Sequence, residues 1–434
     1  MRHPRRRLRW SLTVVVAVLA ALVSACGSAP TGPPVLTWYT NPDDGGQAEI
    51  ARRCTEASGG RYTITTSTLP RQASEQRQQL VRRLAANDSS IDIMSIDPPY
   101  VPEFAQAGFL APMPPAVEAA AREDRVPSSI EASTWQGRLV AVPFWANTQL
   151  LWYRKSAVAA MGIDMNQPVT WDQLIQAAAR ARTQFAAQGV RGESLTVWVN
   201  ALIESGGGSV ITNVGETNPE MVQLGLTAPP GIEAARILRS FGDAGVAPPG
   251  FPTADEDTSS DSFQSGSAAF MVNYPFIWGK ATSAVEEGTL DPAVPADYGW
   301  TIYPRTAPDL PSAPPLGGIN LGVGAFSAHP DLAYEATTCI TRPDNSAYYM
   351  VSNGNPSSRI SVFSDPAVLA EFPMAPVIRD SLTQAKPRPQ TAYYAEVSGG
   401  IQRTFHPPGA VTPGATNEAA TALITAVLRK EALL

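Results

Sequence analysis

The chain has 434 residues, of which 44% are apolar and 16% charged, and its formal net charge is −7. This length is two to three times that of a usual domain, so it predicts two lobes or one large α/β unit and excludes a small disulfide scaffold. Loss of residues 1–25, which carry five arginines and no acidic residue, would lower the net charge from −7 to −12. We therefore expect no binding to nucleic acid.

The first 25 residues have the pattern of a cleaved export signal. A basic leader precedes an apolar run from Leu12 to Val23, and the small residues Ser24 and Ala25 stand directly before Cys26. The run is short for a stable membrane span. The small-small-Cys ending resembles a bacterial lipobox, which implies that Cys26 is diacylated and anchors the chain on the extracytoplasmic face of the cell membrane. An ordinary signal peptide cut elsewhere is the alternative, and residues 26–34 indicate a tether.

Two further cysteines follow Cys26 in the sequence. Cys54 lies on a helical pattern over residues 46–58, and Cys339 lies on another over residues 331–341. Because disulfides persist in an exported protein, we expect a Cys54–Cys339 bond, with two buried free thiols as the alternative. The bond would join segments 285 residues apart and would require the chain to return to its first lobe.

The start of the mature chain alternates strands with helices. The patterns predict strands over residues 35–40, 61–66 and 91–96, and helices over residues 46–58 and 74–86. This alternation indicates a parallel sheet, whose loops at the carboxyl ends of the strands carry ligands. Asn41, Asp43 and Asp97 follow two of these strands, so we expect them to share one rim.

The sequence predicts further strands and helices along the rest of the chain. Strands are expected over residues 139–144 and 150–153, joined through residues 145–148, and later over residues 268–273 and 319–325 after a Pro-rich crossover at 304–315. Helices are expected over residues 171–188, 195–205, 232–241, 332–341, 393–404 and 418–429. The fold class is therefore α/β, with two lobes between which the chain crosses more than once.

Four motifs in this order carry a resemblance to a known family. They are AVPFWANT from Ala141, the strand pair ending at Tyr153, FxxGxAAF from Phe263 and GGIN from Gly317. Together they resemble the extracytoplasmic solute-binding lipoproteins of carbohydrate ABC importers, the maltose-binding-protein class. The resemblance implies a two-lobed periplasmic-binding-protein-like fold (class II), with hinge crossovers and a ligand cleft between two α/β domains. It implies lobe 1 at residues 35–145 and 317–357, and lobe 2 at residues 146–316 and 358–434.

A narrower similarity is to mycobacterial trehalose-binding lipoproteins. It covers RRCTEASGGRYTI from Arg52, LPRQASEQRQQLVRRLAAND from Leu69, NTQLLWYR from Asn147 and MVNYPF from Met271. The similarity implies trehalose or a related disaccharide as ligand, and ABC permease membrane subunits with an ATPase as partners. The sugar-contacting positions that it implies are Asp43, Asp97, Asn147, Glu256, Tyr274, Gly318 and Arg388. Tyr274 stands where the family pattern has Trp, which keeps an aromatic face but reduces the stacking area.

These residue types suit a disaccharide, which presents hydroxyl groups and apolar C–H faces. Carboxylates and amides bond to hydroxyl pairs, and Arg388 offers a fork of donors on a loop stiffened by Pro387 and Pro389. Tyr274 supplies a ring face, and Gly318 lets the backbone approach the ligand closely.

Each candidate also has a purely structural interpretation. Asp43 and Asp97 could cap helices, Asn147 could satisfy hinge backbone, and Arg388 could pair with a neighbouring acid. Glu256 could be the solvated start of a helix, and Tyr274 could be core with Trp278 exposed instead. For Glu204 and Trp198 the apolar helix spacing favours packing.

Enzyme hypotheses have less support. Histidine occurs only at positions 3, 329 and 406, and the sequence contains no HExxH, GxSxG, P-loop or GxGxxG motif. A cell-wall glycoside hydrolase that uses Asp97 and Glu256 is the alternative from another class, but opposed hydrogen bonding in a closing cleft explains this pair without catalysis. Another α-glucoside or oligosaccharide, or a glycerophosphodiester, is the alternative ligand. We expect a monomeric binding protein with no enzymatic activity, no metal and no cofactor.

Overall fold

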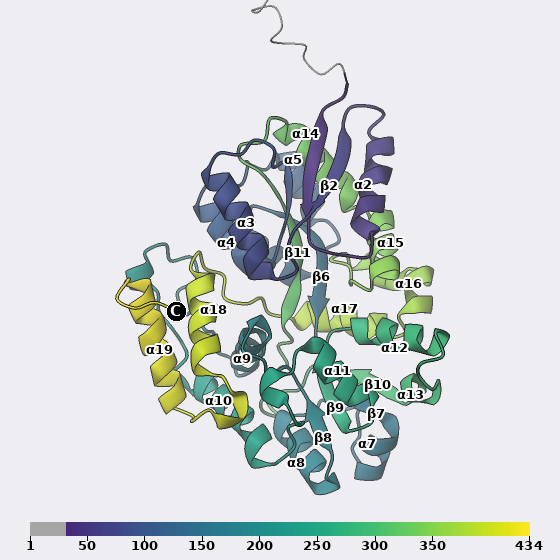
Figure 1. The fold of residues 1–434 in the computed structure, drawn as a ribbon, viewed down its shortest axis with the longest axis vertical. Coiled ribbons are helices and arrows are strands. Elements are labelled where there is room, and N and C mark those ends of the chain that lie inside the picture. The colour runs from purple at the N-terminus through teal and green to yellow at the C-terminus, as the bar shows by residue number, and fades with distance from the viewer. Residues whose placement is uncertain (1–31) are drawn as a thin grey trace, which may run out of the picture.

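The computed structural model describes residues 32–434, whose strands form two main sheets (Figure 1). The first sheet has the strand order β2-β1-β3-β11-β6, and the second has the order β10-β7-β9-β8. The first sheet consists of β1 (Val35–Thr40), β2 (Thr63–Thr68), β3 (Ile93–Ile96), β6 (Val142–Thr148) and β11 (Leu316–Val323). The second consists of β7 (Leu150–Arg154), β8 (Gln184–Ala186), β9 (Ala268–Asn273) and β10 (Tyr298–Thr301). A hairpin of β4 (Thr134–Trp135) and β5 (Arg138–Leu139) stands apart from both sheets.

The first sheet is covered by helices on both faces. β1 pairs in parallel with β2 and β3, whereas β11 runs antiparallel to β3 and β6. Leu36 and Trp38 of β1 face one core, and Tyr39 faces the other, as the alternation of a strand requires. The first core includes α2 (Gly46–Ala57), α14 (Pro330–Ile340) and α15 (Pro343–Asn353), and the second includes α3 (Ala73–Ala85) and α4 (Val101–Gln106).

The second sheet is covered in the same way. β7 runs antiparallel to β9 and β10, and β8 runs parallel to β9. One core contains the ring of Trp198, which packs against Trp171 and Phe241 as the helix spacing predicts. The helices of this core are α8 (Trp171–Ala181), α9 (Glu193–Ser205), α10 (Pro229–Asp243), α18 (Tyr394–Thr404) and α19 (Ala415–Leu428). The opposite core is built on α11 (Glu256–Gln264), α12 (Phe276–Glu286), α16 (Pro366–Glu371) and α17 (Ala375–Gln384).

The chain passes between the sheets through short segments. Gln149 alone separates β6 of the first sheet from β7 of the second, and residues 302–315 lead back from β10 to β11. A third passage follows α15 and leads to α16 and α17, which pack against the core of the second sheet. The remaining helices are α5 (Pro115–Arg122), α6 (Pro127–Glu131), α7 (Lys155–Met161) and α13 (Ala293–Ala296). The fold is the two-lobed α/β architecture that the sequence predicts.

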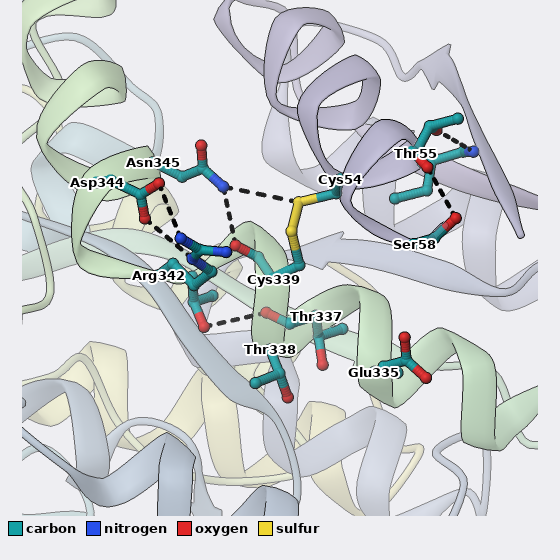
Figure 2. Close-up of a disulfide and its surroundings, with 12 residues drawn as sticks. Cys54, Thr55, Ser58, Glu335, Thr337, Thr338, Cys339, Arg342, Asp344 and Asn345 are labelled. Carbon is teal, nitrogen blue, oxygen red and sulfur yellow. Dashed lines mark hydrogen bonds and ion pairs between the residues drawn. A yellow bond between two sulfur atoms is a disulfide. The ribbon is translucent and has the colours of Figure 1, made fainter. Parts of the chain in front are cut away.

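Cys54 and Cys339 form the expected disulfide, with their Cα atoms 5.8 Å apart. The bond joins α2 to α14, which lie side by side in Figure 2. Nδ2 of Asn345 donates to Sγ of Cys54 at 3.6 Å and to the backbone oxygen of Cys339 at 2.9 Å. The chain therefore returns to the first lobe after β11, as the cysteine spacing requires.

Several expected boundaries are wrong, and three of them differ because of strand pairing. β6 runs on to Thr148, because residues 145–148 pair with β11 instead of forming a connection. For the same reason Gly317 and Gly318 lie inside β11 rather than before it. The helix expected over residues 171–188 ends at Ala181, because Arg182 has a left-handed backbone (φ 55°) and the following residues pair with β9 as β8. Hydrophobic periodicity does not report these tertiary pairings.

The expected export signal, and Cys26 with it, lie outside the described residues. Among residues 32–434, no helix has the length and apolar character that a membrane crossing requires.

Candidate functional site

A cavity of about 600 Å³ lies between the two lobes and collects the candidate residues. Asp43, Asp97, Asn147, Glu256, Tyr274, Gly318 and Arg388 all line it. Asn41 lies there too, so Asn41, Asp43 and Asp97 share one rim as expected. Sequence reasoning did not select several other lining residues, among them Arg71, Trp145, Glu193, Ser194, Asn353 and Asn355.

Asp43 both lines the cavity and caps α2. Its carboxylate accepts the backbone N–H of Gly45, the residue just before α2, at 3.1 Å and that of Gln47 in the first turn at 2.7 Å. The helix-cap interpretation is therefore correct for Asp43, and it fixes the carboxylate at the mouth of the cavity.

Asp97 follows β3 and makes no capping hydrogen bond to the helical turn after it. Its carboxylate instead forms a two-pronged ion pair with the guanidinium of Arg388, so the helix-cap alternative is wrong here. Burial raises the pKa of the Asp97 carboxyl, a shift that Arg388 opposes and Glu193 reinforces. A carboxylate so buried stays charged only while its cation remains in place.

Arg388 joins the two lobes through its guanidinium group. Nη1 lies 2.6 Å from Oε1 of Glu193, which begins α9, and both terminal nitrogens contact Asp97, which ends β3. Only 5% of the Arg388 side chain is exposed. Two backbone hydrogen bonds of Lys386, with Pro314 and Leu316 at 2.9 Å each, hold the loop that carries Arg388 in place. The interpretation that Arg388 pairs with neighbouring acids is thus correct, and the pairing stands within the wall of the cavity.

Glu193 is a central residue that sequence reasoning missed. Its carboxylate accepts hydrogen bonds from Arg388, from the hydroxyl of Tyr394 and from the hydroxyl of Ser398 at 3.0 Å. The expected helix began at Leu195, two residues too late to include it. An acidic residue in the first turn of a helix is a usual helix start, so its sequence context alone gave no sign of this network.

Glu256 is half-buried rather than solvated. It occupies the first turn of α11, after the cap residue Asp255, and its Oε1 accepts the hydroxyl of Ser194 at 2.6 Å. Burial raises the pKa of the Glu256 carboxyl. The surface interpretation is therefore wrong, and Glu256 presents a carboxyl group from the lobe opposite Asp43.

Two aromatic side chains line the cavity. Tyr274 follows β9, and burial raises the pKa of its phenol. Trp145 of β6, which sequence reasoning placed in a connection, is partly buried, and its Nε1 is buried without a partner among the described residues. Trp278, the alternative to Tyr274, packs instead against Trp300 at a ring separation of 5.6 Å. The cavity wall therefore contains two aromatic side chains in addition to its carboxylates.

Asn147 and Gly318 belong to the paired strands β6 and β11. Oδ1 of Asn147 accepts the backbone N–H of Thr148 at 2.9 Å, so this side chain does satisfy hinge backbone. Gly318 has φ +121°, and a Cβ there would lie 2.2 Å from the backbone oxygen of Trp145. The close approach of the β6 backbone therefore already requires glycine at this position.

The site as a whole favours a neutral ligand rich in hydroxyl groups. Carboxylates and amide oxygens accept hydroxyl protons, the rings offer faces to C–H groups, and the charge of Arg388 is already matched by two acids. Among residues 32–434, no group of three or more His, Cys, Asp or Glu side chains is placed to hold a metal ion.

Two α/β lobes around a polar cavity with aromatic walls define a solute-binding protein. The chain belongs to the family of bacterial extracellular solute-binding proteins, which it matches over residues 58–347.

Individual relatives agree with this class. A probable ABC transporter-binding protein of Deinococcus radiodurans is 25% identical over 364 residues, which are 79% of this chain and 81% of the relative. A mannitol-binding protein of Pseudomonas aeruginosa is 27% identical over 73% of this chain and 71% of its own length. The maltose-bound MalE3 structure of T. maritima has a TM-score of 0.73 and 26% identity, over 91% of this chain and 99% of its own. These relatives are binding proteins, in agreement with the expectation of no enzymatic activity.

Proposed function

We propose that this protein is the sugar-binding component of an ABC importer and that its ligand is trehalose or a disaccharide of similar size. The observation that carries the proposal is the interlobe cavity of about 600 Å³, where carboxyl groups from both lobes stand beside two aromatic rings. A disaccharide offers hydroxyl donors to the carboxyl groups and apolar faces to the rings.

Relatives support the sugar class more strongly than the particular sugar. The Pseudomonas relative is named for mannitol, and the T. maritima structure holds maltose. The choice of trehalose rests on the sequence similarity of the segments around Arg52, Leu69, Asn147 and Met271 to trehalose-binding lipoproteins. Delivery of the sugar to permease subunits driven by an ATPase follows from the same class of protein.

Binding would draw the lobes together around the sugar. Asp43 and Asp97 extend from the first lobe, Glu256 and Tyr274 from the second, and a ligand that touches both sets favours the closed arrangement over the open one. Because the ion pairs of Arg388 with Asp97 and Glu193 already link the lobes, the sugar would add its contacts to these existing interlobe contacts.

Calorimetric titration with trehalose, maltose, mannitol and a glycerophosphodiester tests the ligand. We expect one saturable site for trehalose, and its intact recovery afterwards separates binding from hydrolysis. No trehalose binding at millimolar concentration would refute the trehalose assignment, and release of reducing sugar would refute the binding function.

Variants of the cavity wall make the test specific to the site. Tyr274→Ala should weaken binding by about tenfold or more through loss of the ring face, and Glu256→Gln should weaken it through loss of a charged acceptor. Glu118→Gln, on the outer helix α5, is the control and should bind as the wild type does.

We also propose that acylated Cys26 anchors the protein to the outer face of the cell membrane. Mass spectrometry of the protein from membranes should show a diacylated N-terminal cysteine, and Cys26→Ser should release the protein into the soluble fraction. An unmodified chain cut at another position would refute the anchor without affecting the sugar-binding proposal.

A further inference from the structure

One buried tyrosine lies behind the first-lobe wall of the interlobe cavity. Tyr349 of α15 is 1% exposed and does not line the cavity itself. Two residues that do line it follow Tyr349 along the chain, Asn353 at the end of α15 and Asn355 just beyond that end. The contacts of Tyr349 reach both the aromatic and the polar part of this wall.

The ring of Tyr349 supports the aromatic part of the wall. It stacks on Phe144 at a centroid separation of 5.0 Å, and its centroid lies 6.5 Å from that of Trp145, which lines the cavity. The ring also meets the start of α2, because a Cβ at Gly46 would lie 2.9 Å from Cδ2 of Tyr349. The helix that Asp43 caps therefore begins directly against this ring.

The hydroxyl of Tyr349 contacts the polar part of the wall. Nδ2 of Asn355 donates to this hydroxyl at 3.4 Å. Burial raises the pKa of the Tyr349 phenol, and the nearby Asp43 carboxylate raises it further. Because a carboxylate only accepts hydrogen bonds, Asp43 favours a hydroxyl whose proton points toward it and whose oxygen is open to Asn355.

The bond to Tyr349 decides which end of the Asn355 amide is available to a ligand. An amide side chain carries two donors on its nitrogen and an acceptor on its oxygen, and half a turn of the group exchanges them. With Nδ2 held by Tyr349, Oδ1 of Asn355 has no partner among the described residues and is not enclosed by them. This oxygen is therefore free to accept a proton from a ligand hydroxyl.

We propose that Tyr349 is a positioning residue of the ligand site, which holds the Asn355 amide with its oxygen toward the cavity and supports the Trp145 ring from behind. This part of the wall then accepts a hydroxyl proton of the ligand instead of donating to a ligand oxygen. The proposal rests on the proposed sugar-binding function and adds to it the direction of one hydrogen bond.

Calorimetry with trehalose on a Tyr349→Phe variant tests this role. The substitution keeps the stacked ring and removes only the hydroxyl, so Asn355 loses the partner that orients it. We expect the affinity to fall about fivefold, which corresponds to one hydrogen bond. Tyr334→Phe is the matched control, because Tyr334 is also 1% exposed in the same core but donates its hydroxyl to the backbone oxygen of Ala111, outside the cavity wall.

A double-mutant cycle separates positioning from a merely structural role. If Tyr349 acts through Asn355, then Tyr349→Phe should add no further loss of affinity to Asn355→Ala, because the residue that it positions is already gone. Both tyrosine variants should lower Tm by similar small amounts, whereas only Tyr349→Phe should weaken binding.

A second measurement needs no sugar. The side-chain amide signals of Asn355, assigned by their absence in Asn355→Ala, report the bond to Tyr349 in NMR spectra of the isotope-labelled protein. Tyr349→Phe should move these signals, and Tyr334→Phe should leave them in place.

Each opposite result would overturn the proposal. These are wild-type affinity in a folded Tyr349→Phe variant, an equal loss in Tyr334→Phe, additive losses with Asn355→Ala, or unmoved Asn355 signals in Tyr349→Phe. Failure of trehalose to bind the wild type would refute the proposed ligand alone, and the Asn355 signals would then decide whether Tyr349 orients this amide.

Discussion

Substitution of Arg388 by methionine should strongly destabilise this protein. The change keeps much of the side-chain volume but removes the cation between Asp97 and Glu193. Asp97 is 13% exposed in its side chain, so its carboxylate would be left almost without water or partner. Removal of one member of a buried ion pair costs about 3–5 kcal/mol of unfolding free energy. For a chain of this size that corresponds to a fall in Tm of roughly 4–6 °C.

The loss of stability in Arg388→Met should depend on pH in a definite direction. Without Arg388 the pKa of Asp97 must rise further in the folded protein, because burial already raises it. A folded-state pKa above the unfolded one means that stability falls as the pH rises between the two values. The variant should therefore lie closer to the wild type at pH 5 than at pH 7.5.

Thermal unfolding followed by circular dichroism at both pH values measures these differences. Arg379→Met on α17 is the control, because Arg379 pairs with Asp380 at the surface and its loss should change stability by less than about 0.5 kcal/mol. An Arg388→Met protein as stable as the wild type, or equally destabilised at both pH values, would refute the view that Arg388 serves to neutralise two acids.

Three further outcomes follow from the described contacts. Glu193→Gln should weaken sugar binding severalfold in a folded protein, since it frees one side of the Arg388 guanidinium, and calorimetry measures the change. Gly318→Ala should lower Tm by several degrees in a thermal scan, because its Cβ would meet the β6 backbone at 2.2 Å. Cys54→Ser should lower the unfolding free energy by about 2–5 kcal/mol in urea titration, and a reductant should do the same to the wild type alone.

Local patterns predicted the architecture well where each element carries its own signal. The strand over residues 35–40 was predicted with its observed bounds, and so was the strand over residues 268–273, because both are short apolar runs. The prediction failed at residues 145–148 and 184–186. There the strand exists because of a partner far away in sequence, and no local periodicity reports such a partner.

The site was predicted only in part for the same reason. The seven residues drawn from family similarity meet in one cavity, but whether they bind a sugar is still a prediction. Trp145 was missed because its strand was taken for a connection, and Glu193 because the helix was expected to start at Leu195. The role of Glu193 depends on Arg388 and Tyr394, which lie about two hundred residues further along the chain.

The disulfide between Cys54 and Cys339 constrains the molecule selectively. Both of its helices pack on the first sheet, so the covalent link stays inside one lobe and does not itself restrain one lobe against the other. The chain segment that the bond closes into a ring, from Cys54 to Cys339, nevertheless contains all the strands of the second sheet. A protease that nicks an exposed turn anywhere inside that ring would leave two fragments still tethered, and the damage would become visible on a gel only after reduction.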